Sequence, residues 1–311
     1  MMSLKNQKGL WDLHIHGLAG IDFMNASERD MEKACSLLFK KGISVFTPTL
    51  LTDSEAGLIR ALKNWGNFIE RFRTEKPKKM AVPLGIHLEG PFLNPEKAGA
   101  HEKRYLVNPR LDLMKRFIVA SSNHIAIVTL APELKGAKAL IQYLKKVGIR
   151  AQLGHSTATE TQTKEALKWG AQGLTHAFNA MTYHHRDGGL LSALVHAPHT
   201  TSEIICDGIH VSESMVFLLA KAFPERIYAV SDGCPATLTK DGTTHKMGPL
   251  TLEKKGDAAY IAGTKTLAGS ALLLPEHRKK ILKKYHQNKA LITSIFAPVN
   301  CLVLKRRLTQ F

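Results

Sequence analysis

Five short apolar segments of this chain end in a histidine or a carboxylate, and this feature constrains the fold most. In residues 85–92, Gly-Ile-His-Leu-Glu-Gly-Pro-Phe, Glu89 ends an apolar run directly before a Gly-Pro pair that cannot continue a strand. The other four segments end at His14 and His16, at His155, at His176 and at Asp232. These side chains can form one site only if the fold brings the ends of five strands together.

Apolar runs and amphipathic runs alternate along the chain, which indicates alternating strands and helices. We expect strands at 9–16, 43–48, 81–88, 124–132, 149–153, 173–176, 202–207 and 226–231. We expect helices at 26–42, 52–73, 111–120, 136–147, 159–169 and 212–222, with Ser27 as an N-cap and Gly42 as a stop. Short, continuously apolar strands are typical of a sheet buried on both faces. The prediction is an α/β fold, a (β/α)8 TIM barrel, whose functional residues lie at the C-terminal strand ends.

The predicted barrel covers residues 9–275 of the 311-residue chain, and such barrels typically need about 250 residues. Residues 1–8 are interpreted as a leader. Residues 240–262 interrupt the alternation with an Asp-Gly turn and with the segments Leu-Thr-Leu at 250–252 and Ala-Ala-Tyr-Ile at 258–261. They predict a small β-hairpin insertion after the eighth strand. Residues 276–311 are expected to form a basic C-terminal helix and tail that closes the barrel.

The formal charge of +17 raises the question of a nucleic-acid partner. Nine Lys and Arg residues and no acidic residue lie between His277 and Phe311, so about half of the excess belongs to one terminal stretch. This distribution favours a solvated face or a degraded terminus over an anion-binding patch, and we expect no nucleic-acid partner. Four scattered cysteines without CxxC spacing indicate reduced thiols, and no apolar run is long enough to cross a membrane. The expected location is the cytoplasm.

The residues at the strand ends are of the types that bind divalent metals. His14 and His16 are separated by two positions on a strand, so both side chains point to the same face, here the barrel interior. With Glu89, His155 and His176 they form a set of imidazoles and a carboxylate typical of Zn²⁺, Fe²⁺ or Mn²⁺ hydrolases. Such a metal lowers the pKa of water and polarises a carbonyl group. Asp232 suits the role of the carboxylate that moves the proton of that water.

Six motifs occur in a fixed order between Trp11 and Leu274. They are His-Leu-Glu-Gly-Pro-Phe at 87–92, Ala-Gly-Ala-His at 98–101, Leu-Gly-His-Ser at 153–156, Thr-His-Ala-Phe-Asn-Ala-Met at 175–181, Ile-Cys-Asp-Gly-Ile-His-Val at 205–211 and Val-Ser-Asp at 230–232. This set resembles the N-acetylglucosamine-6-phosphate deacetylase family of the amidohydrolase superfamily. The resemblance implies a metal-dependent barrel enzyme that hydrolyses the acetamide of N-acetylglucosamine 6-phosphate to glucosamine 6-phosphate and acetate.

The resemblance also implies roles for individual residues. Glu89, His155 and His176 match metal ligands, and Asp232 matches the catalytic carboxylate. His210 matches a histidine that contacts the sugar and steadies the acetyl carbonyl. Further substrate contacts are implied for the following four residues: His101, Asn179, Ala180 and Arg186. The fork of an arginine suits a phosphate, although the loop that carries Arg186 is one residue shorter than the family's pattern.

The first strand and the two ends of the chain concern the number of metal ions and the domain composition that the resemblance implies. Family members that keep both histidines of the HxH pair look binuclear, so His14 and His16 make a second metal plausible but not required. A homodimer is implied by the family. The family also has a β-sandwich built from segments before the first strand and after the last helix, and we expect this domain to be absent here. Two alternatives therefore stay open: a deacylase for another N-acyl amino sugar, and a catalytically impaired, truncated homologue that only binds.

Overall fold

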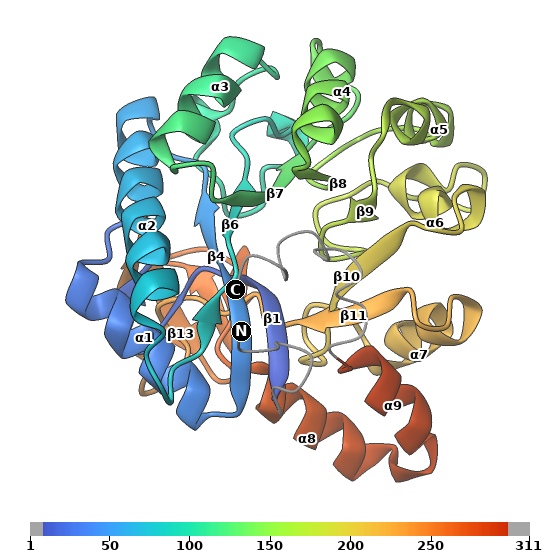
Figure 1. Ribbon diagram of the computed structural model, residues 1–311. Coiled ribbons are helices and arrows are strands. Elements are labelled where there is room, and N and C mark those ends of the chain that lie inside the picture. The colour runs from blue at the N-terminus through green and yellow to red at the C-terminus, as the bar shows by residue number, and fades with distance from the viewer. Residues whose placement is uncertain (1–8, 298–311) are drawn as a thin grey trace.

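Eight parallel strands form a nearly closed barrel, and they follow one another around it in the order of the sequence (Figure 1). The computed structural model describes residues 9–297. The barrel strands are β1 (Leu10–Ile15), β4 (Ile43–Leu51), β6 (Ile86–Glu89), β7 (Ile125–Leu130), β8 (Arg150–Leu153), β9 (Gly173–Leu174), β10 (Thr201–Ile205) and β11 (Ile227–Val230). A short strand β5 (Val82–Pro83) pairs with β4, and β2 (Gly17–Leu18) pairs with β3 (Ile21–Asp22). The predicted TIM barrel is confirmed.

Polar contacts between β1 and the end of β11 close the ring. The backbone N–H of His16 donates to the carbonyl of Gly233 across 2.6 Å, and the N–H of Asp232 donates to the carbonyl of His14 across 2.9 Å. Below them the buried side chain of Asp12 accepts the N–H of Ser231 across 3.0 Å. The segment that carries Asp232 is therefore held directly against the segment that carries the HxH pair.

Helices surround the barrel and follow its strands in turn (Figure 1). They are α1 (Glu28–Lys40), α2 (Glu55–Glu75), α3 (Leu111–Ala120), α4 (Ala137–Val147), α5 (Glu160–Trp169), α6 (Ala193–His196), α7 (Glu213–Ala222), α8 (Leu274–Lys284) and α9 (Lys289–Ile295). The predicted N-cap Ser27 accepts the N–H of Asp30, and Thr159 forms the same kind of cap for α5. Gly42 follows the end of α1 with a φ of 88°, which the absence of a side chain permits.

Aromatic packing fixes α2 against the barrel. Trp65 is completely buried, and its ring lies 5.0 Å from Phe23 and 6.2 Å from Phe46, both in edge-on orientation. Its indole N–H donates to the carbonyl of Phe23 across 2.9 Å, so the polar atom of this large side chain is also satisfied.

Two predictions of secondary structure need correction. The predicted strand at 81–88 is two short strands, β5 and β6, because the register against β4 shifts by one residue between them, at Leu84 and Gly85. Between β9 and β10 we expected no helix, but a 3₁₀ turn at Gly189–Ser192 leads into the single turn of α6. A helix this short is too brief to show an amphipathic period in the sequence.

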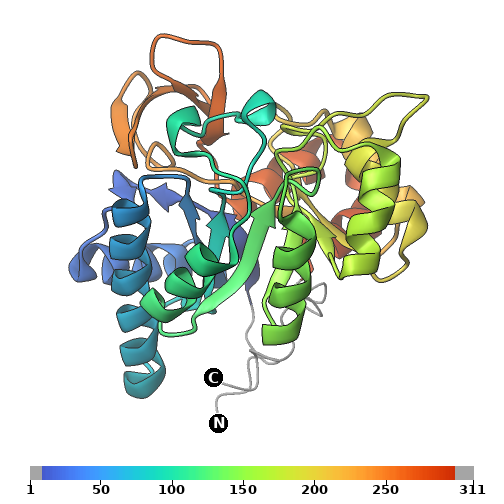
Figure 2. The ribbon, with the colours of Figure 1, turned by 90° about the horizontal axis from the view of Figure 1, so that it is seen from above.

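The predicted hairpin after the eighth strand is a larger element. Four antiparallel strands form a separate sheet in the order β12 (Thr244–Met247), β13 (Leu250–Lys255), β14 (Ala258–Ile261) and β15 (Leu267–Ser270). Figure 2 shows this sheet above the barrel, on the side where the loops after the strands gather. The two predicted segments lie in β13 and β14, whereas β12 and β15 were not predicted because these short strands mix polar and apolar residues.

Helices α8 and α9 complete the ring between α7 and α1 (Figure 1). They belong to the stretch predicted to close the barrel, although α8 begins at Leu274, just before the predicted boundary. The predicted leader, residues 1–8, and the final part of the basic tail, residues 298–311, lie outside the described residues. The division of the chain at residue 275 stays a proposal. Within residues 9–297, no helix combines the length and the apolar character that crossing a membrane requires.

Candidate active site

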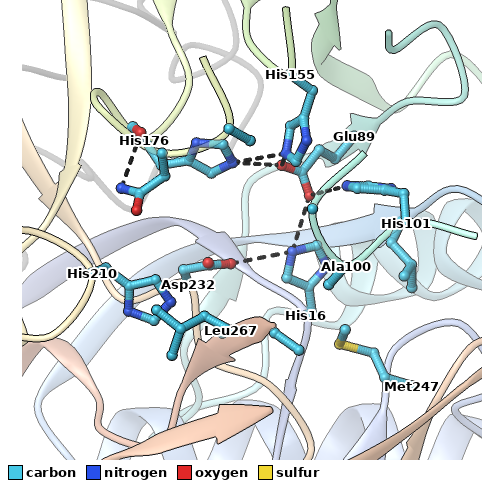
Figure 3. Close-up of a pocket in the computed structure, with 16 residues that line it drawn as sticks. His16, Glu89, Ala100, His101, His155, His176, His210, Asp232, Met247 and Leu267 are labelled. Atoms are coloured by element: carbon cyan, nitrogen blue, oxygen red, sulfur yellow. Dashed lines mark hydrogen bonds and ion pairs between the residues drawn. The ribbon is translucent and has the colours of Figure 1, made fainter. Parts of the chain in front are cut away.

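The predicted metal-binding side chains meet at one end of the barrel. His14 lies on β1 with His16 just beyond it, and Glu89 is the last residue of β6. His155 and His176 follow β8 and β9 within two residues of the strand ends. Because the strands are parallel, all of these positions lie at their C-terminal edge. Figure 3 shows the side chains of His16, Glu89, His155 and His176 turned toward one another.

Glu89 occupies the centre of this group. Its Oε1 lies 2.9 Å from His176 Nε2 and 3.2 Å from His155 Nε2. Its Oε2 lies 3.2 Å from His16 Nε2, 3.4 Å from His14 Nε2 and 3.5 Å from His101 Nε2. The two oxygens of one carboxylate thus face two separate pairs of histidines, and Glu89 bridges them.

The nitrogen atoms in each pair of histidines converge. His14 Nε2 lies 3.1 Å from His16 Nε2, and His155 Nε2 lies 3.1 Å from His176 Nε2. Two facing lone pairs repel unless a proton or a cation lies between them, so this geometry fits a metal. The donor set of imidazole nitrogen and carboxylate oxygen suits Zn²⁺, Fe²⁺ and Mn²⁺. The five residues that would hold one or two such ions are His14, His16, Glu89, His155 and His176.

A backbone carbonyl orients one of these rings. His155 Nδ1 lies 2.7 Å from the carbonyl of Lys97, in the loop that follows β6. A ring nitrogen that faces a carbonyl must carry the proton, which leaves the other nitrogen, Nε2, with its lone pair toward Glu89. The loop after β6 therefore helps to hold His155 in the orientation that a metal requires.

Asp232 lies beside the pair formed by His14 and His16. Its Oδ1 lies 3.4 Å from His16 Nε2 and 3.5 Å from His14 Nε2, and its side chain is 14% exposed. Burial raises the pKa of this carboxyl, but the hydrogen bond with His16 and the nearby imidazoles outweigh burial and lower it to about 2. Asp232 is therefore an ionised base at neutral pH.

The pKa values of the residues at the centre of the site are also set by burial on one side and by neighbouring charges on the other. Burial raises the pKa of Glu89, but the surrounding imidazoles hold it well below its ordinary value. Burial lowers the pKa of His16, but Asp232 and Glu89 outweigh burial and raise it to about 9. His101 is dominated by burial, which lowers its pKa to about 4, so it remains a neutral donor or acceptor.

Three of the proposed metal-binding and catalytic residues have a left-handed backbone that only glycine adopts easily. The φ angles are 48° at His155, 29° at His176 and 50° at Asp232. Such conformations cost on the order of 1–3 kcal/mol each and persist where the surroundings enforce them. Here they occur just after β8, β9 and β11, where they turn these side chains into the pocket.

His210 lies beside Asp232 at the rim of the pocket (Figure 3). Its Nδ1 lies 2.7 Å from Asp207 Oδ2, and Asp207 Oδ1 accepts the backbone N–H groups of Ile209 and His210. Burial lowers the pKa of His210, but the Asp207 carboxylate outweighs burial and raises it. The ring is therefore held with Nδ1 toward Asp207, which leaves Nε2 as the nitrogen available to a ligand.

The structure gathers the predicted substrate contacts except one. His101, Asn179 and Ala180 line the same pocket as Glu89 and Asp232. His101 Nδ1 also lies 2.9 Å from the hydroxyl of Thr52, which fixes its ring. Arg186 is not among the residues that line this pocket: it is exposed, in a loop after β9.

Comparison with known proteins agrees with this geometry. Residues 9–269 match the model of the family described as "Amidohydrolase family". The chain belongs to the amidohydrolase family. The predicted resemblance to N-acetylglucosamine-6-phosphate deacetylases is also confirmed: the enzyme of that name from Caenorhabditis elegans is 32% identical over 291 residues, which are 88% of this chain and 68% of the relative. The corresponding Rattus norvegicus protein is 35% identical over 84% of this chain and 65% of the relative. This amidohydrolase therefore spans about two thirds of the length of these relatives.

Solved structures show the same similarity. An N-acetyl-D-glucosamine-6-phosphate deacetylase variant from Mycobacterium smegmatis, in complex with N-acetyl-D-glucosamine-6-phosphate, superimposes with a TM-score of 0.87 at 29% identity. That match covers 96% of this chain and 77% of the other. The deacetylase from Thermotoga maritima gives a TM-score of 0.83 at 28% identity, over 96% and 78% of the two chains.

Several residues that shape the amidohydrolase site were not singled out from the sequence. Glu203 on β10 contacts His14 from below, and Asp207 orients His210. Met247 and Leu267 of the four-stranded sheet form an apolar part of the pocket wall (Figure 3). Glu203 lies within the strand predicted at 202–207, and a carboxylate inside a predicted buried strand was the available signal.

Proposed function

We propose that this amidohydrolase hydrolyses the acetamide of N-acetylglucosamine 6-phosphate, with a divalent metal, to glucosamine 6-phosphate and acetate. The observation that carries the proposal is the position of Glu89 between two converging histidine pairs, with Asp232 beside one of these pairs in the same pocket. Support comes from relatives of this name at 32–35% identity and from a similar structure that was solved with this sugar phosphate.

The metal, when bound, would lower the pKa of a water molecule and polarise the acetyl carbonyl. Asp232 is ionised and faces the centre of the pocket, so it can accept the proton of the attacking water. The same carboxyl then delivers this proton to the nitrogen of the departing amine. His210 gives its Nδ1 proton to the hydrogen bond with Asp207, whose charge also raises the pKa of the ring. When the ring carries its second proton, the Nε2–H beside Asp232 would donate to the carbonyl oxygen as negative charge develops on it.

Recognition of the sugar phosphate is assigned to the loops around the pocket. Asn179 and Ala180 form part of its wall. The backbone N–H and the side-chain NH₂ of Asn179 donate to carbonyls of their own turn, so the proposed contacts are Asn179 Oδ1 and the backbone N–H of Ala180. His101 is proposed to contact the substrate from the loop after β6. Arg186 is retained as the proposed phosphate contact, although within this chain it is exposed and does not line the pocket. The homodimer implied by the family remains part of this proposal.

A second candidate substrate differs only in the sugar. An N-acetylgalactosamine-6-phosphate deacetylase from Escherichia coli O157:H7 is 33% identical over 84% of this chain, a value close to those of the glucosamine relatives. The chemistry at Glu89 and Asp232 would be the same. The loops around the pocket would distinguish the two sugars by the configuration at one carbon. The proposed location is the cytoplasm, and the three described cysteines, Cys35, Cys206 and Cys234, are free, buried thiols.

The test is purified protein, freed of metal and then loaded separately with Zn²⁺, Fe²⁺ or Mn²⁺. Release of free amine is measured from N-acetylglucosamine 6-phosphate, from N-acetylgalactosamine 6-phosphate and from unphosphorylated N-acetylglucosamine. The proposal expects the first substrate to have the highest kcat/KM. No release with any metal that is demonstrably bound would favour the impaired homologue instead.

A further inference from the structure

Glu203 is a fully buried carboxylate directly beneath the proposed metal centre. Its Oε2 lies 2.9 Å from His14 Nδ1 and 3.3 Å from the backbone N–H of His176. It therefore touches one residue of each histidine pair around Glu89. None of the roles assigned above uses this contact.

The other oxygen of Glu203 is held by a second layer of polar side chains. The amide Nε2 of Gln152 donates to Glu203 Oε1 across 2.9 Å. The Gln152 amide cannot turn around, because its oxygen accepts Arg150 Nε across 3.0 Å and the Tyr228 hydroxyl across 2.9 Å. Position 203 thus receives an N–H group from each side and needs two acceptors, which a carboxylate supplies.

Burial of a carboxylate in a barrel core is costly, and an apolar residue would pack there at lower cost. The contact with His14 explains why a carboxylate is present at this position. A carboxylate that accepts from Nδ1 keeps the His14 proton on that nitrogen and the Nε2 lone pair toward His16 and Glu89.

We infer that Glu203 is a positioning residue of the metal centre, which fixes the tautomer and orientation of His14 and the backbone of His176. This inference rests on the proposed metal centre. Strand β10 contributes no proposed metal ligand. Its residue Glu203 instead supplies the acceptor that orients His14, a proposed ligand on β1. If Glu203 served barrel packing alone, its oxygen toward His14 would not need to be a hydrogen-bond acceptor.

The substitution Glu203→Gln separates these two roles, because the amide is nearly isosteric but brings only one acceptor. Its NH₂ group must face either the Gln152 NH₂ group or His14 Nδ1. In the second case the proton of His14 moves to Nε2, where a metal would bind. The substitution Tyr228→Phe is the matched control, since it removes a hydroxyl 3.4 Å from Glu203 Oε1 without touching the His14 contact.

A double variant that combines Glu203→Gln with Gln152→Glu should restore the hydrogen bonds that Glu203→Gln loses. The amide at 203 can then donate to the new carboxylate at 152 and still accept from His14 Nδ1. Because the number of donors and acceptors is conserved, this double variant also covers the case in which Glu203→Gln alone does not fold.

The experiment measures the affinity for Zn²⁺ by competition with a chromophoric chelator, with circular dichroism as the check of folding. We expect Glu203→Gln to bind Zn²⁺ about 10–100-fold more weakly than the wild type, and Tyr228→Phe and the double variant to remain within about threefold. Wild-type affinity in Glu203→Gln, or an equal loss in Tyr228→Phe or in the double variant, would overturn the inference. A wild-type protein that binds no Zn²⁺ would overturn the metal centre itself and the inference with it.

Discussion

The His210 ring lies with its Nδ1 2.7 Å from Asp207 Oδ2, and the second oxygen of Asp207 is held by two backbone N–H groups. The carboxylate therefore cannot turn away, and the ring it holds presents Nε2 to the pocket. Asp207, which was given no role from the sequence, thus orients His210, the proposed contact to the acetyl carbonyl.

Substitution Asp207→Asn should lower kcat on the order of 100-fold, a loss similar to that for removal of one donor to an oxyanion. The amide still accepts the backbone N–H groups, but it no longer holds His210 through a charged acceptor. KM and metal content should change little, and both are measured on the same preparation. An unchanged kcat would show that the orientation of His210 does not limit the reaction.

Substitution Glu89→Gln should abolish most metal binding, because it removes the negative charge that faces both histidine pairs. The expected loss is at least about 10-fold in affinity, and activity should fall with metal content. Elemental analysis after dialysis measures the content directly. Full metal content together with full activity would remove Glu89 from the centre of the account.

Substitution Arg186→Ala tests the proposed phosphate contact. A lost charge-assisted hydrogen bond is worth about 1.5–3 kcal/mol, so KM for the phosphorylated sugar should rise about tenfold or more. KM for the unphosphorylated sugar should not change. His185→Ala, in the same exposed loop, serves as the control. Equal effects of Arg186→Ala on both sugars would show that Arg186 does not read the phosphate.

The dependence of stability on pH should carry a contribution from His277, which is fully buried beside Ser270. Burial lowers its pKa from 6.5 to about 4 in the folded protein. Above pH 6.5 the ring is neutral in both states and contributes nothing. As the pH falls from 6.5 toward 4, the unfolded chain takes up a proton that the folded chain refuses, so the free energy of unfolding falls.

The slope is about 1.4 kcal/mol per pH unit within that window, which is on the order of 2 kcal/mol between pH 6.5 and 5. His277→Gln does not titrate and can still contact Ser270. Urea unfolding of both proteins without metal, at pH 7.5 and 5, should show the larger loss in the wild type. Equal losses would mean that His277 is protonated in the folded state.

Local signals were sufficient to predict most of the barrel. Unbroken apolar runs of four residues marked β7 and β11, and caps such as Ser27 marked the helices. Elements only about one period long were missed or misread: α6 has four residues, and β5 has two. The four-stranded sheet after β11 was predicted only as a hairpin, since its strands have no consistent apolar face in the sequence.

The candidate site was predictable to the extent that each residue ends a strand. The convergence of Glu89, His155, His176 and Asp232 follows from the parallel barrel alone. Glu203 and Asp207 were not assigned roles, because their importance depends on contacts across the barrel or with a neighbouring ring. The exposed position of Arg186 depends on the conformation of a loop, which no periodic pattern encodes.

The central claim is that Glu89 and its histidines hold a metal that Asp232 uses to cleave an acetamide. The most direct measurement is release of amine from N-acetylglucosamine 6-phosphate by wild type and Asp232→Asn, each first stripped of metal and then reloaded. The account predicts no turnover without metal, and turnover by the reloaded wild type. It also predicts that reloaded Asp232→Asn retains most of its metal but has a kcat about 10²–10⁴-fold lower. Turnover by the metal-free protein, or wild-type turnover by Asp232→Asn, would contradict it.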